Sequence, residues 1–206
     1  MPIKFEKNIN NTTRLAVWEI TETPEQLADG LLVATPENFA KYTRNIHWLA
    51  SRRLIQEMLN LTGPVLEKDV YGKPYIKGSK VKISMSHAGK YAAAMVSKKH
   101  LVGCDIEQLN EKIHRVTHKF VREDERACFI EGHETEAAYM IWSSKESLFK
   151  LYGRKEIHFL HNLMIHPFEL KDEGIVQATI MKNGISAELN VNYEMLEDYM
   201  LTYTLR

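Results

Sequence analysis

Apolar residues recur along two stretches of the chain at the spacing of an amphipathic helix. In residues 38–61 they lie three to five positions apart, at Leu49, Leu54, Met58 and Leu61. In residues 137–152 one side of a helix would carry Ala138, Ile141, Leu148 and Phe149. Such a stripe is buried when a helix packs on a core, so we predict two long helices, the first ended by Gly63-Pro64.

Shorter apolar runs predict strands in the first half. Residues 15–20 are the first such run, and Thr23-Pro24 after it is typical of a helix start with proline at the first position. Residues 81–85 alternate as a half-buried strand, and a second strand is expected at residues 91–96. We therefore predict a hairpin that turns after His87, which places this histidine at a strand end.

The second half repeats the order of helix and then strands. A helix is predicted to start at residues 120–125, strands are predicted at residues 175–181, 186–191 and 200–205, and Asn183-Gly184 is a good hairpin turn. The pattern favours an α+β fold with two related lobes, each a small, mostly antiparallel sheet packed on a long helix. We assign residues 1–100 and 101–206 to the two lobes and expect the site at their junction.

Composition indicates a soluble globular protein. The 206 residues are 44% hydrophobic and 26% charged, and 27 basic side chains balance 27 acidic ones, so no global field would recruit nucleic acid or anionic lipid. No apolar run is long enough to span a bilayer, and the first residues lack the layout of a secretory signal, so we expect a cytoplasmic protein. The two cysteines, Cys104 and Cys128, exclude a disulfide framework.

The candidate chemistry centres on acidic residues. Asp105 and Glu107 are two positions apart in a predicted strand and share one face, whereas Cys104 points to the other side as a small buried residue. Neighbouring carboxylates repel unless a cation lies between them. A third carboxylate from Glu146, together with phosphate oxygens, would complete the oxygen shell that Mg²⁺ prefers.

The second predicted helix places Trp142, Glu146 and Lys150 on one face, at steps of four residues. The alternative is an ordinary surface ion pair between Glu146 and Lys150, worth a few tenths of a kcal/mol. The nearby pair of acids favours the metal site over this alternative.

Other charged groups are more ambiguous. Arg44, Arg52 and Arg53 on the first helix suit either phosphate contact or plain solvation, while His158, His161 and His166 are expected to be surface or structural residues. Sequence motifs of serine hydrolases, P-loops, dinucleotide-binding folds and zinc proteases are absent from the 206 residues.

Five short motifs occur in the order seen in one enzyme family. They are Gly72-Lys73-Pro74, Ser84-Met85-Ser86-His87, Val102-Gly103-Cys104-Asp105-Ile106-Glu107, Phe120 with Glu123 to Glu125, and Trp142-Ser143-Ser144-Lys145-Glu146-Ser147-Leu148-Phe149-Lys150. In this order the chain resembles the 4'-phosphopantetheinyl transferases, specifically the two-lobed, monomeric surfactin-synthetase-type branch. The resemblance covers residues 38–153.

The resemblance implies transfer of the 4'-phosphopantetheine arm from coenzyme A to a serine hydroxyl of an apo carrier protein, with release of adenosine 3',5'-bisphosphate. It implies that Asp105, Glu107 and Glu146 bind Mg²⁺, with Mn²⁺ as a substitute, and that Lys150 stabilises phosphate or the leaving group. The residues implied to contact coenzyme A are Gly72, Lys73, Pro74, Ser86, His87 and either Arg44 or Arg52.

Two further expectations concern the serine and the carrier. We hypothesise that Glu146 accepts the serine proton, directly or through a metal-bound water, as the acid from the opposite lobe. Carrier proteins of this class usually present an acidic helix, which a basic surface of Lys112, Arg115, His118 and Lys119 would attract, unless this is an ordinary mixed-charge face. The rival functions are a noncatalytic binding module and a Mg²⁺-dependent phosphohydrolase.

Overall fold

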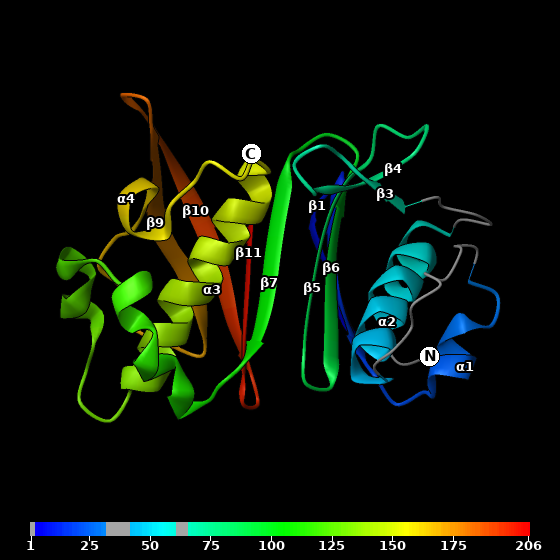
Figure 1. Ribbon diagram of the computed structural model, residues 1–206, viewed down its shortest axis with the longest axis horizontal. Helices are drawn as coiled ribbons and strands as arrows, with labels where there is room; N and C mark the ends of the chain where they lie inside the picture. Colours follow the sequence, from blue (N-terminus) through cyan, green and yellow to red (C-terminus); the bar gives the residue numbers. More distant parts are fainter. Residues whose placement is uncertain (1–2, 32–41, 61–65) are drawn as a thin grey trace. The chain divides into compact units, whose positions relative to one another are not determined.

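The computed structural model describes residues 3–31, 42–60 and 66–206, and the side chains of residues 42–45 lie outside its description. The chain divides into two compact units, Met1–Val102 and Gly103–Arg206. Both contain antiparallel strand pairs and helices, which confirms the mixed α+β class (Figure 1). No helix in the described residues is both long and apolar enough to cross a membrane.

The first unit has a four-stranded antiparallel sheet in the order β1-β2-β6-β5. Its strands are β1 (Ile3–Asn10), β2 (Thr13–Glu19), β5 (Lys82–Ala88) and β6 (Tyr91–Ser97). The predicted hairpin around Gly89 is confirmed, with His87 opposite Ala92. The strand predicted at residues 15–20 is confirmed as β2, but it is not the first strand, because β1 precedes it. β1 alternates as IKFE but ends in polar residues.

A small two-stranded sheet and two helices complete this unit. The small sheet pairs β3 (Leu66–Lys68) with β4 (Pro74–Ile76). Helix α1 (Pro24–Ala28) begins after Thr23, as predicted: the Gln26 backbone N–H donates to the Thr23 hydroxyl, and the Thr23 N–H donates to the Gln26 side chain. Helix α2 (Tyr42–Leu59) lies along the large sheet, and the ending predicted at Gly63-Pro64 lies outside the described residues.

The core of the first unit lies between α2 and the large sheet. The helix contributes Leu49, Ala50, Leu54, Ile55 and Met58, and the sheet contributes Ala16, Trp18, Ile83, Ala92, Ala94 and Val96. Burial of this apolar stripe is what stabilises the predicted helix, since a helix alone in water is marginal.

The second unit has a five-stranded sheet in the order β7-β11-β10-β9-β8. Its strands are β7 (Val102–Gln108), β8 (Leu163–Ile165), β9 (Glu173–Lys182), β10 (Ile185–Leu196) and β11 (Tyr199–Leu205). The predicted turn between β9 and β10 is confirmed, with Asn183 and Gly184 at φ of 52° and 76°.

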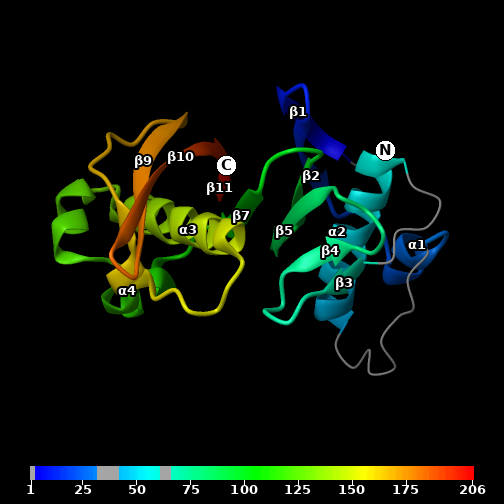
Figure 2. The ribbon, with the colours of Figure 1, turned by 90° about the horizontal axis from the view of Figure 1, so that it is seen from above.

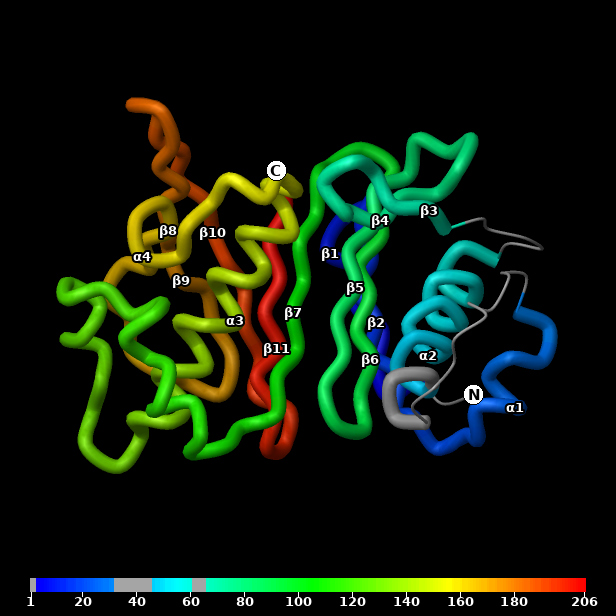
Figure 3. The backbone as a smooth tube through the Cα atoms, viewed as in Figure 1, coloured from blue at the N-terminus to red at the C-terminus, as the bar shows by residue number. Residues whose placement is uncertain are grey.

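Helix α3 (Glu134–Tyr152) runs along this sheet, and short α4 (Phe159–Asn162) follows it (Figures 2 and 3). The helix start predicted at residues 120–125 is the start of a short 3-10 helix, Glu123–Cys128, and not of an α-helix. Two more 3-10 helices, Glu111–Arg115 and Thr117–Lys119, precede it, and together the three make up the 3-10 segment. The Glu125 carboxylate caps the start of the last one by accepting the Arg122 backbone N–H at 2.8 Å.

Gly103 allows β7 to approach α3 closely. A Cβ atom on this residue would lie 2.0 Å from the Ser147 carbonyl oxygen and 2.7 Å from the Leu151 nitrogen, and both are backbone atoms that cannot give way. This close packing sets the distance between the two elements that carry the acids.

Hydroxyl groups then fasten α3 to β11. Ser147 Oγ donates to the Thr202 carbonyl at 3.1 Å, and its oxygen lies 2.7 Å from Thr202 Oγ1. Thr202 Oγ1 in turn donates to the Ser143 carbonyl at 2.8 Å. These groups are fully buried, so they need the partners they have.

Candidate functional site

Asp105 of β7 is the centre of a polar cluster in the second unit. Its side chain is buried, and each carboxylate oxygen has a partner on α3. Lys150 Nζ donates to Oδ1 at 2.7 Å and Ser143 Oγ donates to Oδ2 at 2.9 Å. The Asp105 carboxylate is therefore held at one position by two residues two helical turns apart.

Glu107 projects toward the same helix. Its Oε1 accepts the Trp142 indole N–H at 2.9 Å. Burial raises the pKa of Glu107 to about 7, the Asp105 charge adds to this, and the Trp142 hydrogen bond and Lys150 oppose it. Strand parity predicted that Asp105 and Glu107 share a face, and the contacts of both with α3 confirm it.

Glu146 and Lys150 lie one turn apart on α3. Burial raises the pKa of Glu146 to about 7, the Asp105 charge contributes, and Lys150 opposes. Burial alone would lower the pKa of Lys150, but the charges of Asp105 and Glu146 leave it above its usual value. The alternative of a surface ion pair along the helix does not describe Lys150, because its ammonium reaches across to β7.

All three acids lie in the second unit. The expectation that Glu146 comes from a different lobe than Asp105 and Glu107 is wrong, because the helix that follows β7 packs back on the same sheet. Within the described residues, no three His, Cys, Asp or Glu side chains converge closely enough to hold a metal ion. In this conformation Asp105 and Glu107 are instead occupied by protein donors, and the metal site stays a prediction.

A buried ion pair lies behind this cluster. Lys145 and Glu125 are 0% and 1% exposed, and the Lys145 ammonium donates to Glu125 Oε2 at 2.7 Å. The same ammonium donates to the carbonyls of Phe120 at 2.7 Å and Phe159 at 3.2 Å. Glu125 Oε1 accepts the Ile165 backbone N–H at 2.8 Å. The pair joins α3, the 3-10 segment and the end of β8.

The position of Lys145 in the predicted helix is the sequence feature that indicates this buried pair. Lys145 falls four residues after Ile141 and three before Leu148, at a buried position of the predicted apolar stripe. A charged residue at a core position requires a buried partner. The partner, Glu125, was visible only as one acid within an acidic run.

In the first unit, Gly72, Lys73 and Pro74 form the turn between β3 and β4. Asp69 Oδ1 accepts the backbone N–H of both Tyr71 and Lys73 at 2.9 Å, and Gly72 has φ of 90°. Burial lowers the pKa of Lys73, Asp69 opposes this, and Lys82 of β5 adds to it. The Lys73 ammonium in this turn is therefore half-buried and close enough to the Lys82 ammonium to be affected by its charge.

Ser86 and His87 are neighbours on β5, so their side chains point to opposite faces of the strand. His87 shares its face with Ile83 and Met85, which pack on the core against α2. The two residues that the resemblance assigns to coenzyme A therefore lie on opposite faces of one strand.

The first-helix arginines differ in their surroundings. The Arg52 guanidinium lies 3.6 Å from the centre of the Trp48 ring and donates to the Trp48 carbonyl, and burial lowers its pKa to about 10. Arg53 pairs with Glu57 at 3.0 Å and donates to the Asp29 carbonyl at 2.8 Å, which is a structural role. The side chain of Arg44 lies outside the described residues.

The remaining candidates divide between interior and surface. The His166 ring lies 2.8 Å from the Thr179 hydroxyl, which supports a structural role, and Cys104 is buried as expected. Lys112, Arg115, His118 and Lys119 are exposed on the 3-10 segment, in positions open to a partner.

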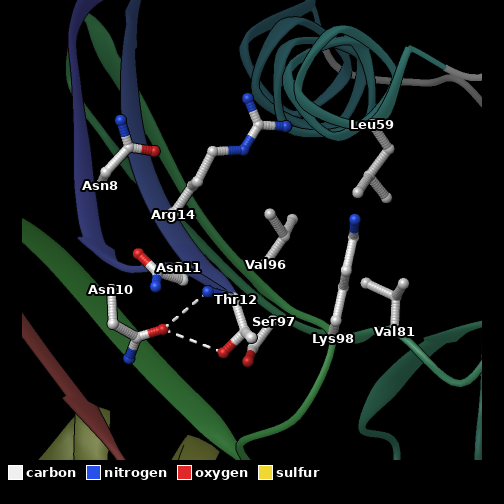
Figure 4. A pocket seen from close by; sticks show the side chains of 10 residues that line it. All are labelled: Asn8, Asn10, Asn11, Thr12, Arg14, Leu59, Val81, Val96, Ser97 and Lys98. Atoms are coloured by element: carbon white, nitrogen blue, oxygen red, sulfur yellow. Dashed lines mark hydrogen bonds between the residues drawn. The ribbon is translucent and has the colours of Figure 1, made fainter.

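A pocket of about 450 Å³ in the first unit contains none of the predicted site residues (Figure 4). It lies between the β1–β2 turn, the end of α2 and the end of β6. Two of its polar side chains are paired: Arg14 pairs with Glu6 of β1 at 2.7 Å, and Asn10 Oδ1 accepts from the N–H and hydroxyl of Thr12.

Comparison with known proteins matches the chain to one enzyme superfamily. A model of the 4'-phosphopantetheinyl transferase superfamily matches residues 101–204, which include β7, α3 and the acidic cluster. The chain is 25% identical over 111 residues to "4'-phosphopantetheinyl transferase gsp" of Aneurinibacillus migulanus, covering 52% of this chain and 46% of that protein.

Two further relatives are somewhat more similar. "4'-phosphopantetheinyl transferase AcpT" of Salmonella typhi is 29% identical over 140 residues, covering 62% of this chain and 67% of that protein. A "4'-phosphopantetheinyl transferase" of Bacillus subtilis is 28% identical over 135 residues, covering 64% and 58%. The matched part thus spans about half of the Aneurinibacillus protein and somewhat more of the others.

Proposed function

Because the chain belongs to the 4'-phosphopantetheinyl transferase superfamily, we propose that it transfers the 4'-phosphopantetheine arm of coenzyme A to a serine hydroxyl of an apo carrier protein. The reaction would depend on Mg²⁺ and release adenosine 3',5'-bisphosphate. One observation carries the proposal: β7 and α3 bring Asp105, Glu107, Glu146 and Lys150 into one electrostatically coupled cluster.

The chemistry of the donor set suits a divalent cation. Three carboxylates interact with one ammonium, and burial, to which repulsion from the Asp105 charge adds, raises the pKa of Glu107 and Glu146 to about 7. Asp105, Glu107 and Glu146 offer only hard oxygen ligands, which suit Mg²⁺ and also Mn²⁺. When bound, the ion would neutralise charge on the diphosphate of coenzyme A.

Lys150 would stabilise the reacting phosphate. Its raised pKa keeps the ammonium charged at neutral pH, and Asp105 holds it in place before any ligand arrives. An ammonium has three protons and can donate to a phosphate oxygen as well as to Asp105. Phosphoryl transfer needs mainly such positioning and charge stabilisation.

Glu146 would accept the serine proton. The serine oxygen bonds to the phosphorus that carries the pantetheine arm, the bond from this phosphorus to the bridging oxygen breaks, and adenosine 3',5'-bisphosphate leaves with the electron pair. In the metal-free protein burial raises the pKa of Glu146 to about 7, and a bound cation would favour its ionised form, in which the carboxylate can accept the proton directly or through a metal-bound water.

The first unit would bind the nucleotide part of coenzyme A. The half-buried Lys73 in its turn, the exposed His87 and the Trp48-stacked Arg52 are cationic or titratable groups suited to phosphate, and Arg44 is a further candidate. Gly72, Pro74 and Ser86 would lie near the adenine. In both units the strand before the long helix pairs with the last strand, β2 with β6 and β7 with β11, which supports two related lobes.

The carrier would meet the exposed basic residues of the 3-10 segment, Lys112, Arg115, His118 and Lys119. We further propose that the enzyme is a cytoplasmic monomer with no nucleic-acid or membrane partner. The balanced charge of the chain supports the absence of a nucleic-acid partner.

Mass spectrometry tests the function directly. The protein is incubated with coenzyme A, Mg²⁺ and an apo carrier protein, and the carrier is examined for the added mass of one phosphopantetheine arm. A carrier whose acceptor serine is replaced by alanine is the control. A nucleotide product without a modified carrier would point to a phosphohydrolase, and coenzyme A binding without turnover would point to a noncatalytic module.

A further inference from the structure

Two histidine rings stack against each other in the first unit. His47 of α2 and His87 of β5 have ring centres 4.7 Å apart and planes only 14° from parallel. Stacking places one flat ring against the other and restricts rotation of both side chains. The two residues are 40 positions apart in the sequence, so the contact depends on the packing of α2 on the sheet.

A hydrogen bond fixes the His47 ring. His47 Nε2 lies 2.7 Å from the carbonyl oxygen of Gly89. A carbonyl only accepts, so the Nε2 proton is the donor and the tautomer of His47 is defined. Gly89 lies in the β5–β6 turn with φ of 50°, two residues after His87. The ring of His47 is therefore anchored to the backbone that carries its stacking partner.

We propose that His47 is a positioning residue for the phosphate contact of His87, and that it acts through ring stacking. The inference rests on the proposed function, in which His87 touches a phosphate of coenzyme A. An exposed histidine at a strand end would otherwise sample several rotamers, and binding would have to select one of them. The stacked ring keeps the His87 imidazole in one plane before the ligand arrives.

Three substitutions separate the two contacts of His47. His47→Phe keeps a flat ring but loses the hydrogen bond to Gly89. His47→Gln keeps a donor for the carbonyl but loses the ring, and His47→Ala loses both. His100→Ala, in the loop after β6 of the same unit, is the matched control for loss of an imidazole.

The measurements are calorimetric binding of coenzyme A, and kcat and KM for coenzyme A with saturating carrier and Mg²⁺. We expect His47→Ala to weaken binding and raise KM about three- to tenfold, as loss of one ordered side chain would, with kcat little changed. His47→Phe should recover most of the affinity, His47→Gln should recover less, and His100→Ala should match the wild type.

The outcomes distinguish this inference from the proposed function. If the wild type neither binds coenzyme A nor modifies the carrier, the proposed function fails. If the wild type does both and His87→Ala binds weakly, but His47→Ala behaves as the wild type, only the positioning role fails. If His47→Phe binds coenzyme A as weakly as His47→Ala while His47→Gln binds it as tightly as the wild type, ring stacking is not how His47 positions His87. Thermal unfolding and the ring resonances of His87 show whether each variant is folded and whether the ring has moved.

Discussion

Removal of the Glu125 carboxylate should destabilise the second unit strongly. In Glu125→Ala the Lys145 ammonium, which is 0% exposed, would keep only the carbonyls of Phe120 and Phe159 as partners. The Arg122 and Ile165 backbone N–H groups would also lose their acceptor. Loss of one partner of a buried ion pair costs about 3–5 kcal/mol, so we expect a loss of this size in the free energy of unfolding.

Equilibrium unfolding in urea measures this cost. Trp142 lies on α3 in the second unit, so its fluorescence follows the affected part, whereas Trp18 and Trp48 report on the first unit. Single-tryptophan versions keep these signals apart, which matters because a chain of two units need not unfold in one step. The transition of the second unit should move to lower urea.

The double variant Glu125→Leu with Lys145→Met tests the cause. It removes both charges and fills the space with apolar groups, so it should be much less destabilised than Glu125→Ala, although it still leaves backbone groups without partners. Glu123→Ala is the matched control, since this acid of the same segment is 92% exposed. A Glu125→Ala protein that unfolds with the wild type would refute the buried pair as a source of stability.

The remaining predictions concern the acidic cluster and its packing. Glu146→Gln should lower kcat for carrier modification about 10²–10⁴-fold, the usual contribution of a general base, while Glu134→Gln at the half-buried first position of α3 should not; near-normal turnover of Glu146→Gln would remove the proton-acceptor role. The pKa values of Glu107 and Glu146 are raised from 4.5 to about 7, so between these pH values the folded protein binds more protons than the unfolded chain. The stability of the metal-free protein should therefore fall as pH rises from about 4.5 to 7. Saturating Mg²⁺ should flatten or reverse this fall in thermal unfolding scans. A flat profile for the metal-free protein would contradict the raised pKa values of Glu107 and Glu146. Gly103→Ala should destabilise the second unit by about 1–3 kcal/mol, because its Cβ would meet backbone of α3. Gly184→Asn in the β9–β10 turn should cost less in the same urea assay, because space is open there and asparagine tolerates a φ of 76°; equal effects would show that β7 can shift away.

Local patterns predicted the elements that carry the site. The alternation in β7 placed Asp105 and Glu107 on one face, and the helical spacing placed Glu146 and Lys150 one turn apart. The Thr23 cap and the Asn183-Gly184 turn were likewise predictable, because their chemistry lies within a few residues. These features depend on short-range geometry that the sequence contains.

Features that depend on tertiary packing were harder to predict. The partner of Lys145 is 20 residues away in a segment with no helical period, and its identity depends on how that segment folds over α3. Pairing of Lys150 with Asp105 instead of along its own helix likewise depends on β7 lying beside α3. The lobe bounds predicted at residues 1–100 and 101–206 already place all three acids in the second lobe, and the structure agrees, because β7 and α3 pack together in one unit.

The serine and threonine contacts between α3 and β11 restrict the helix in a way that aliphatic packing would not. Apolar surfaces tolerate small sliding and rolling, but the directional hydrogen bonds that join Ser143 and Ser147 to Thr202 break when the helix turns on its axis. The helix therefore has one angular setting on its sheet. The direction in which Glu146 and Lys150 project from the helix axis is therefore fixed. Any adjustment to a ligand must come from rotation of these side chains or from the strands and loops around them.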